Sequence, residues 1–159
     1  MNKEQLKRHM QVLYHRCIKM LRDPELAWDA LQEIMTRYYE AVQRRNILNP
    51  YHYLQRACTN HCLDLIAKRK KISSLQAPEM LLQFQQAEQD HTAEGKLVVS
   101  TLLKEFEKED VALLMFRYMD QMTYREIAAI YNKSDRGIQK RLDRLEIAVR
   151  DYLQKESRA

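Results

Sequence analysis

The chain has 159 residues, enough for one ordinary domain or two small ones. Only two Gly and three Pro occur, which argues against a sheet-rich protein with many tight turns, and the abundant Leu, Ala, Glu, Lys, Arg and Gln favour an all-α fold. The 27 Lys and Arg exceed the 22 Asp and Glu, and the resulting net charge of +5 favours a polyanionic partner without establishing one.

The first half of the chain predicts three amphipathic helices that share one small core. The first covers residues 4–21. Asp23 is a good N-cap and Pro24 suits the first helical position, so a second helix is expected over 24–42. The third helix is expected over 51–71, where it ends in four consecutive basic residues.

The three cysteines raise the question of a metal site. Cys58 and Cys62 lie one helical turn apart beside His61, whereas Cys17 is distant in the sequence. No CxxC spacing is present, and cysteine often packs as a small hydrophobe. We therefore expect free thiols, with no metal and no other cofactor.

The middle of the chain resembles a linker. Residues 72–95 contain no Lys or Arg, carry four acidic residues and include Pro78, with a short helix expected around 80–86. This acidic linker separates an expected first domain, 1–71, from a second, 96–159. The fold class is therefore two small helical bundles joined by a linker.

The second half predicts four helices, of which the last two form a close pair. Helices are expected at 96–107 and 110–119, followed by one over 123–131 and another that starts after Ser134. The short connection between the last two forces them to cross steeply, as in a helix-turn-helix.

Local capping signals define the ends of this helix pair. Thr123 and Glu126 have the spacing of a capping box, in which each side chain accepts the other residue's backbone N–H. Asn132 can adopt the left-handed conformation that ends a helix, and Ser134 can cap the next one.

The outer face at the start of the last helix is polar and basic. Such side chains reach phosphates and base edges when this part of a helix-turn-helix enters the major groove of DNA. The alternative is an ordinary helical hairpin with a solvated charged face. The candidate DNA-binding residues are Ser134, Asp135, Arg136, Gln139, Lys140, Arg141, Asp143 and Arg144.

A second polar surface is expected on the third helix. Tyr53, Arg56 and Asn60 are spaced to share one face, and the basic residues 68–71 end the same helix. An aromatic ring, a guanidinium, an amide and a basic cluster suit single-stranded or opened DNA. The alternative is a half-buried tyrosine and a basic helix end that complements the helix dipole.

The combination and order of these pieces resemble a known family. "DPELAWDALQEIMTRYYEA" and "YLQRACTNHCLDLIAKRKK" are similar to region 2, and "LLMFRYMDQMTYREIAAIYNKSDRGIQKRLDRLEIAVRDYL" is similar to region 4, of bacterial RNA polymerase sigma factors of the extracytoplasmic-function type. These are the small two-domain members of the sigma-70 superfamily, and the resemblance covers nearly the whole chain.

The resemblance implies a promoter-specificity subunit without a catalytic site. Its expected partners are core RNA polymerase (the β′ clamp helices and the β flap), promoter DNA and an anti-sigma factor. The implied core-polymerase contacts lie on the second helix: Asp29, Gln32, Glu33, Thr36, Arg37 and Glu40. The implied −10 promoter contacts lie on and around the third helix: Asn49, Tyr51, His52, Tyr53, Arg56, Asn60, Lys68, Arg69, Lys70 and Lys71. The −35 element would take the last helix, through the candidates named above.

Four positions depart from the family pattern. Tyr53 replaces the usual tryptophan, and Thr59 replaces a frequent basic residue, which weakens the DNA contact expected there. Trp28 stands where an acidic residue is common and is expected to pack against a neighbouring helix. Gly137 in the last helix costs up to about 1 kcal/mol of helix stability but permits close backbone approach.

Two other functions fit parts of the sequence. A stand-alone helix-turn-helix regulator would bind duplex DNA without polymerase, and an interaction module would sequester a protein partner. An enzyme is not expected, because no Gly-rich phosphate loop or nucleophile arrangement is present.

No segment of the sequence reaches the length of about 20 apolar residues that a transmembrane helix needs, and the N-terminus does not resemble a signal peptide. We therefore expect a cytoplasmic protein with no membrane insertion.

Overall fold

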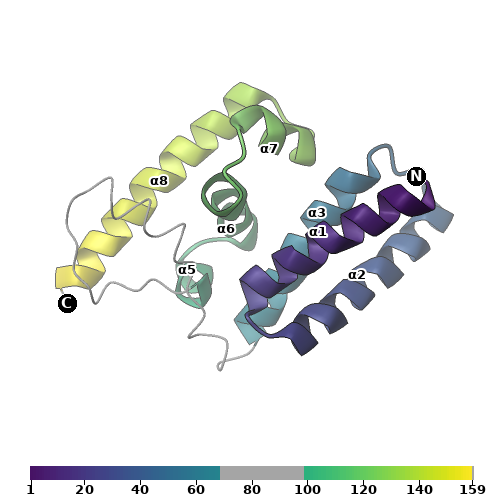
Figure 1. Cartoon of the computed structure of the whole chain (residues 1–159). Coiled ribbons are helices and arrows are strands. Elements are labelled where there is room, and N and C mark those ends of the chain that lie inside the picture. Colours follow the sequence, from purple (N-terminus) through teal and green to yellow (C-terminus); the bar gives the residue numbers. More distant parts are fainter. Residues whose placement is uncertain (69–98, 159) are drawn as a thin grey trace. The chain divides into compact units, whose positions relative to one another are not determined.

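The computed structural model describes residues 1–68 and 99–158, and within these ranges all regular structure is helical (Figure 1). The all-α expectation is confirmed. The chain divides into two compact units, Met1–Leu75 and Gln76–Ala159. The acidic linker over 72–95, with the helix expected at 80–86, lies outside the described residues. Among the described helices, none is both long and apolar enough to cross a membrane.

The first unit is a bundle of three helices, each packed against the other two: α1 (Lys3–Leu21), α2 (Pro24–Arg44) and α3 (Pro50–Lys68). The predicted start of α2 is confirmed, because the Asp23 carboxylate accepts the backbone N–H groups of Glu25 and Leu26 at 2.9 and 3.3 Å, with Pro24 at the first helical position. This cap separates α1 from α2 after a connection of only two residues.

Polar side chains lie inside this bundle. Arg16 of α1 is only 6% exposed, and its Nε donates to Thr59 Oγ1 of α3 at 2.8 Å. The Thr59 hydroxyl in turn donates to the carbonyl oxygen of Gln55 at 3.0 Å. The expectation that Thr59 stands at a DNA-facing position is therefore wrong, since its side chain is fully buried and fixes α1 against α3.

The apolar spacing of α3 predicts a buried face formed by Leu54, Ala57, Cys58, Cys62, Leu65 and Ile66, and the structure corrects two of these positions. Ala57 and Leu65 are only half-buried, whereas Gln55 and Leu63 lie in the core. Val42, expected on the buried stripe of α2, is 41% exposed. Polar residues at buried positions obscure the apolar periodicity from which the face was predicted.

The three thiols converge in the core of the first unit. Cys17 Sγ of α1 lies 3.4 Å from Cys58 Sγ and 3.7 Å from Cys62 Sγ, both on α3. All three side chains are fully buried and free of disulfide bonds. The sequence placed His61 beside Cys58 and Cys62, but the third member of the group is Cys17.

The second unit contains α5 (Val99–Glu105), α6 (Lys108–Leu114), a π-helical turn η2 (Met115–Met119), α7 (Tyr124–Tyr131) and α8 (Asp135–Arg158). The helix expected over 110–119 therefore begins two residues earlier and widens into η2 over its second half. Phe116 of η2 is fully buried and meets the ring of Tyr131 edge-on at 6.1 Å. This contact anchors the end of α7 to the core.

Candidate nucleic-acid interface

The start of α7 is fixed by the predicted capping box. Thr123 Oγ1 accepts the backbone N–H of Glu126 at 3.1 Å, and Glu126 Oε1 accepts the backbone N–H of Thr123 at 3.3 Å. The two side chains also bond directly, Thr123 Oγ1 donating to Glu126 Oε1 at 3.0 Å. The first two bonds each satisfy a backbone N–H group at the start of the helix.

The connection from α7 to α8 is as short as the sequence predicted. Asn132 adopts the left-handed conformation with φ 53°, and the Lys133 N–H donates to the Ala128 carbonyl at 2.9 Å. Ser134 Oγ then accepts the N–H of Gly137 at 3.1 Å. Three residues thus end one helix and start the next, so local hydrogen bonds restrict the direction of α8.

Gly137 has a role in this cap that the sequence did not reveal. A Cβ atom at this position would stand 3.0 Å from Ser134 Oγ, closer than ordinary contact. The missing side chain therefore leaves room for the serine hydroxyl over the first turn of α8, which is a local reason for glycine in the helix.

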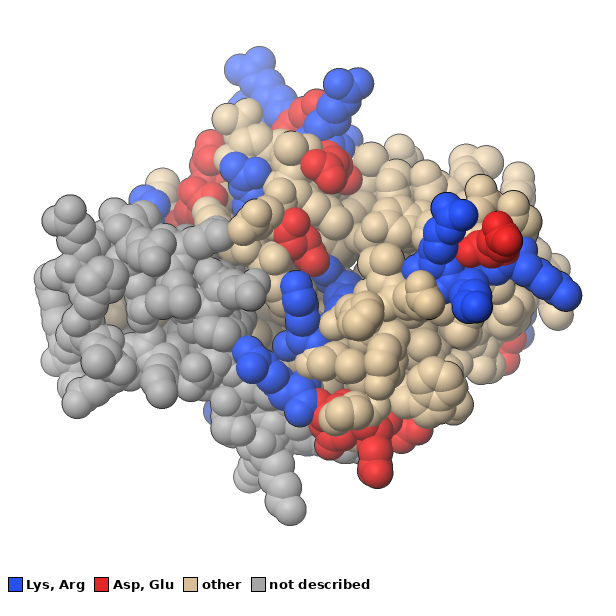
Figure 2. Space-filling model, in the orientation of Figure 1, with Lys and Arg blue, Asp and Glu red and all other residues tan. Residues whose placement is uncertain are grey.

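The first three turns of α8 present a polar, mixed-charge surface. Arg136, Lys140 and Arg144 supply positive charge, and Asp135 and Asp143 supply negative charge. Basic side chains project around the α7–α8 turn with acidic ones between them (Figure 2). The candidate residues on the exposed side are Ser134, Asp135, Arg136, Gln139, Lys140, Asp143 and Arg144.

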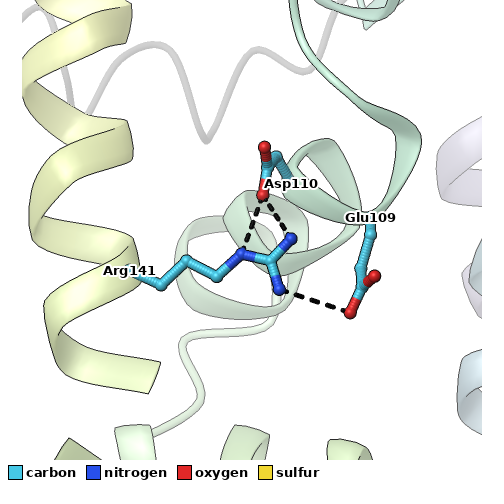
Figure 3. A network of polar contacts seen from close by, with 3 residues as sticks. All are labelled: Glu109, Asp110 and Arg141. Carbon is cyan, nitrogen blue, oxygen red and sulfur yellow. Dashed lines mark hydrogen bonds and ion pairs between the residues drawn. The ribbon is translucent and has the colours of Figure 1, made fainter. Parts of the chain in front are cut away.

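Arg141 differs from the other candidates, because it points toward α6 (Figure 3). Its Nε and Nη2 lie 2.9 and 2.6 Å from Asp110 Oδ1, and its Nη1 lies 3.4 Å from Glu109 Oε1. The Asp110 side chain is only 19% exposed, so the pair is partly shielded from water. Arg141 thus links α8 to α6 and helps to hold the exposed face of α8 in position.

The α3 candidates form a second partly exposed surface. Arg56 and Lys68 are exposed, whereas Tyr53 and Asn60 are half-buried. The Tyr53 ring packs against Tyr38 of α2 at 6.0 Å, and the Arg45 guanidinium lies 5.5 Å from the Tyr53 ring centroid. Arg69, Lys70 and Lys71 fall outside the described residues.

The residues at the start of α3 are engaged within the first unit. Asn49 Oδ1 accepts the backbone N–H of His52 at 3.1 Å, as an N-cap does. The Tyr51 hydroxyl accepts from Gln55 Nε2, and its ring lies 4.8 Å from that of His9 on α1. Asn49 and Tyr51 therefore shape the start of α3, while His52 remains half-buried beside them.

A third candidate surface runs along α2. Its residues recur every three or four positions, as one helix face requires, and all are exposed: Asp29, Gln32, Glu33, Thr36, Arg37 and Glu40. Arg37 Nε pairs with Glu33 Oε1 at 2.9 Å, an exposed pair that contributes little to stability. Trp28 beside this face is 51% exposed and meets Tyr14 of α1 edge-on at 6.1 Å, so the expected packing accounts for only part of its ring.

Sequence reasoning missed two features of these surfaces. Arg45, which follows α2, lies over the Tyr53 ring, and Tyr39 on α2 is 50% exposed. The aromatic character of Tyr39 was visible in the sequence, but its exposure depends on the packing of α2. The Arg45 contact joins two helices across a loop and has no sequence signal.

Comparison with known proteins gives two matches. Residues 6–72 match the family model "Sigma-70 region 2". The chain is also similar to the "ECF RNA polymerase sigma factor SigM" of Bacillus subtilis, with 26% identity over 129 residues that cover 80% of this chain and 79% of that protein. An alignment of this length exceeds either unit, so it includes residues of both.

Proposed function

We propose that the chain, as a sigma factor of the sigma-70 superfamily and of the extracytoplasmic-function type, holds separate elements of a promoter with its two units. In this role it directs core RNA polymerase to promoters and helps to open the −10 element. The observation that carries the proposal is the region 2 match over residues 6–72, which covers nearly all of the three-helix bundle. A stand-alone DNA-binding regulator is disfavoured, because it would not need this domain.

The exposed face of α2 is the proposed contact with the polymerase core, at the β′ clamp helices. Its charged side chains point to solvent along about three turns, and α1 and α3 cover the opposite side of the helix. Charge complementarity on such a face governs the rate and specificity of association more than affinity.

The exposed surface of α3 is the proposed contact with opened −10 DNA. Arg56 and Asn60 would read an unstacked base, and Lys68 with the neighbouring basic residues would hold phosphates. Tyr53, already in contact with Tyr38 and Arg45, would offer a ring edge rather than a free face.

The helix pair α7–α8 is the proposed helix-turn-helix for the −35 element, with the start of α8 in the major groove. Arg136, Gln139 and Lys140 are the proposed base and phosphate contacts. Arg141 is reassigned in this proposal to positioning, since Asp110 and Glu109 hold its guanidinium. The other proposed partners are the β flap of the polymerase and an anti-sigma factor. The proposed location is the cytoplasm.

The test is transcription from promoter libraries by core polymerase with and without the purified chain. We expect the chain to bind core polymerase stoichiometrically. Promoter-specific transcripts should appear only when the chain and core polymerase are both present. Asp29→Lys should weaken core binding, whereas Gln11→Lys, which adds the same side chain to an exposed position on α1, should not. Duplex DNA binding by the free chain without any binding to core polymerase would overturn the proposal in favour of the stand-alone regulator.

A further inference from the structure

The buried thiol group of the first unit has a geometry that the sigma-factor function does not use. Its three sulfur atoms lie within 4.8 Å of one another, and among the described residues they are the only such group of potential metal ligands. Two sulfurs come from α3, one helical turn apart, and the third comes from α1 across 41 residues of sequence. The helices thus gather three ligands that the sequence separates.

Ordinary hydrophobic packing explains burial of a cysteine but not this convergence. A buried free cysteine behaves as a small hydrophobe with only a weak S–H donor, and this donor is a weak driving force for bringing three thiols together. Here Cys17 lies 3.4 Å from Cys58 and 3.7 Å from Cys62, sulfur to sulfur. The sulfur atoms of Cys58 and Cys62 therefore both approach that of Cys17 inside the core.

The spacing of the sulfurs suits one ion at their centre. An ion with metal–sulfur bonds of about 2.3 Å in the plane of three sulfurs requires them to be about 4.0 Å apart. The separations of 3.4 and 3.7 Å from Cys17 and the upper limit of 4.8 Å within the group bracket that value. Shifts of a few tenths of an ångström would equalise the triangle.

The donor set also selects the kind of ion. Three thiolates form a soft site, which favours copper(I) and zinc over hard cations such as magnesium. Structural zinc takes four ligands, and no fourth Cys, His, Asp or Glu of the described residues joins the group. A three-coordinate, thiophilic monovalent ion matches the ligand count better.

We propose that Cys17, Cys58 and Cys62 form a binding site for one copper(I)-type ion inside the first unit. Binding releases the three thiol protons and leaves a three-thiolate complex, with no change in oxidation state. The ion would link α1 to α3 beside the Arg16–Thr59 hydrogen bond. It would therefore stabilise the bundle that carries the proposed interaction faces of α2 and α3. Metal that binds only the folded state raises its stability by mass action.

The test uses the full-length chain, reduced by a phosphine, stripped of metal and kept free of oxygen. Copper(I) is offered as its bicinchoninate complex, and transfer is followed by the loss of the chelator's colour. We expect transfer of one equivalent, a first shell of three sulfur atoms by X-ray absorption, and a rise in the thermal midpoint.

Variants separate the site from adventitious thiol binding. Cys17→Ser and Cys58→Ser should each lower copper(I) affinity at least about tenfold, the loss that even outer-shell partners of a metal site cause. His61→Ala should leave affinity unchanged, because this imidazole is outside the group. Circular dichroism checks the fold of each variant, and the X-ray absorption of the unaltered chain decides the ligand number even if a variant unfolds.

Three results would overturn the proposal: no transfer from the chelator, undiminished transfer to folded Cys17→Ser, or a tighter zinc site with a fourth ligand. None of these measurements involves polymerase or promoter DNA, so the outcome is independent of the proposed function.

Discussion

The cores of the two units differ in what they bury. Every buried polar or charged residue of the described chain, namely Arg16, Gln55 and Thr59, lies in the first unit, as do all three cysteines. The described core of the second unit is formed by aliphatic, methionine and aromatic side chains such as Leu114 and Phe116. The interior of the first bundle thus includes directional polar contacts, whereas the described interior of the second unit is apolar, and its polar link between α8 and α6 through Arg141 and Asp110 is partly exposed.

Because of this difference, the two units position their exposed helix faces by different contacts. In the second unit, hydrogen bonds between residues three to five apart set both ends of α7 and the start of α8. In the first unit, adjacent residues Arg16 and Cys17 reach across to α3 and fix its rotation and height against α1. A buried hydrogen bond that loses one partner costs more than an average bond contributes, so such contacts specify one arrangement.

The largest expected effects come from truncating the two apolar cores. Leu13→Ala should destabilise the first unit, and Leu142→Ala the second, each by about 2–5 kcal/mol, since both side chains are fully buried. Hydrogen exchange resolved by peptide should show faster exchange only in the altered unit. Val12→Ala and Ile147→Ala, at exposed positions on the same helices, are the controls. Equal loss of protection in both units would show that the two units unfold together and not separately.

The next effect concerns the α8 surface. Arg136→Ala with Lys140→Ala should lower transcription from a −35-dependent promoter at least about tenfold, because each such contact is worth about 1–3 kcal/mol. The fold should be unchanged, as both residues are exposed. Lys155→Ala, which removes the same charge from the far part of α8, should leave transcription intact. Normal promoter output from the double variant would remove α8 as the DNA contact.

The polar contact of the first core gives a third prediction. Thr59→Val keeps the side-chain shape but removes the acceptor of Arg16 Nε, and should cost about 1–3 kcal/mol of unfolding free energy in chemical denaturation. Thr36→Val, the same change at an exposed position on α2, should stay within about 0.5 kcal/mol. If the two variants are equally stable, the Arg16–Thr59 bond does not hold α1 to α3.

The caps of the second unit give a smaller effect. Thr123→Ala removes the capping box of α7 and should cost about 1 kcal/mol, visible as a lower thermal midpoint and faster exchange in α7. Arg125→Ala, an exposed change in the same turn, should have almost no effect. An unchanged midpoint in Thr123→Ala would show that packing alone directs α7.

The smallest effect is expected at Arg141. Arg141→Ala should cost about 0.5–1 kcal/mol, because its partners Asp110 and Glu109 are only partly shielded from water. In promoter binding it should lower affinity less than Arg136→Ala does, since its guanidinium points toward α6. Equal losses of promoter binding in these two variants would return Arg141 to the DNA-contacting set.

Features that depend on neighbours along the chain could be predicted from the sequence. The Asp23–Pro24 start of α2, the Thr123–Glu126 capping box and the left-handed Asn132 each need residues only a few positions apart, and all three are present. The sequence also predicted the helical composition and the exposed stripes of α2 and α8, because solvated faces repeat with the period of the helix.

The long-range partners of these helices could not be predicted from the sequence, because they depend on how the helices pack. Thr59 belongs to the core because Arg16 reaches it from α1, and Arg141 faces α6 because Asp110 and Glu109 stand there. Cys17 meets Cys58 and Cys62 because the height and rotation of α1 against α3 place three sulfurs together. Helical periodicity gives the angle of a side chain around its own axis, but not the register between two axes, and that register is set by packing.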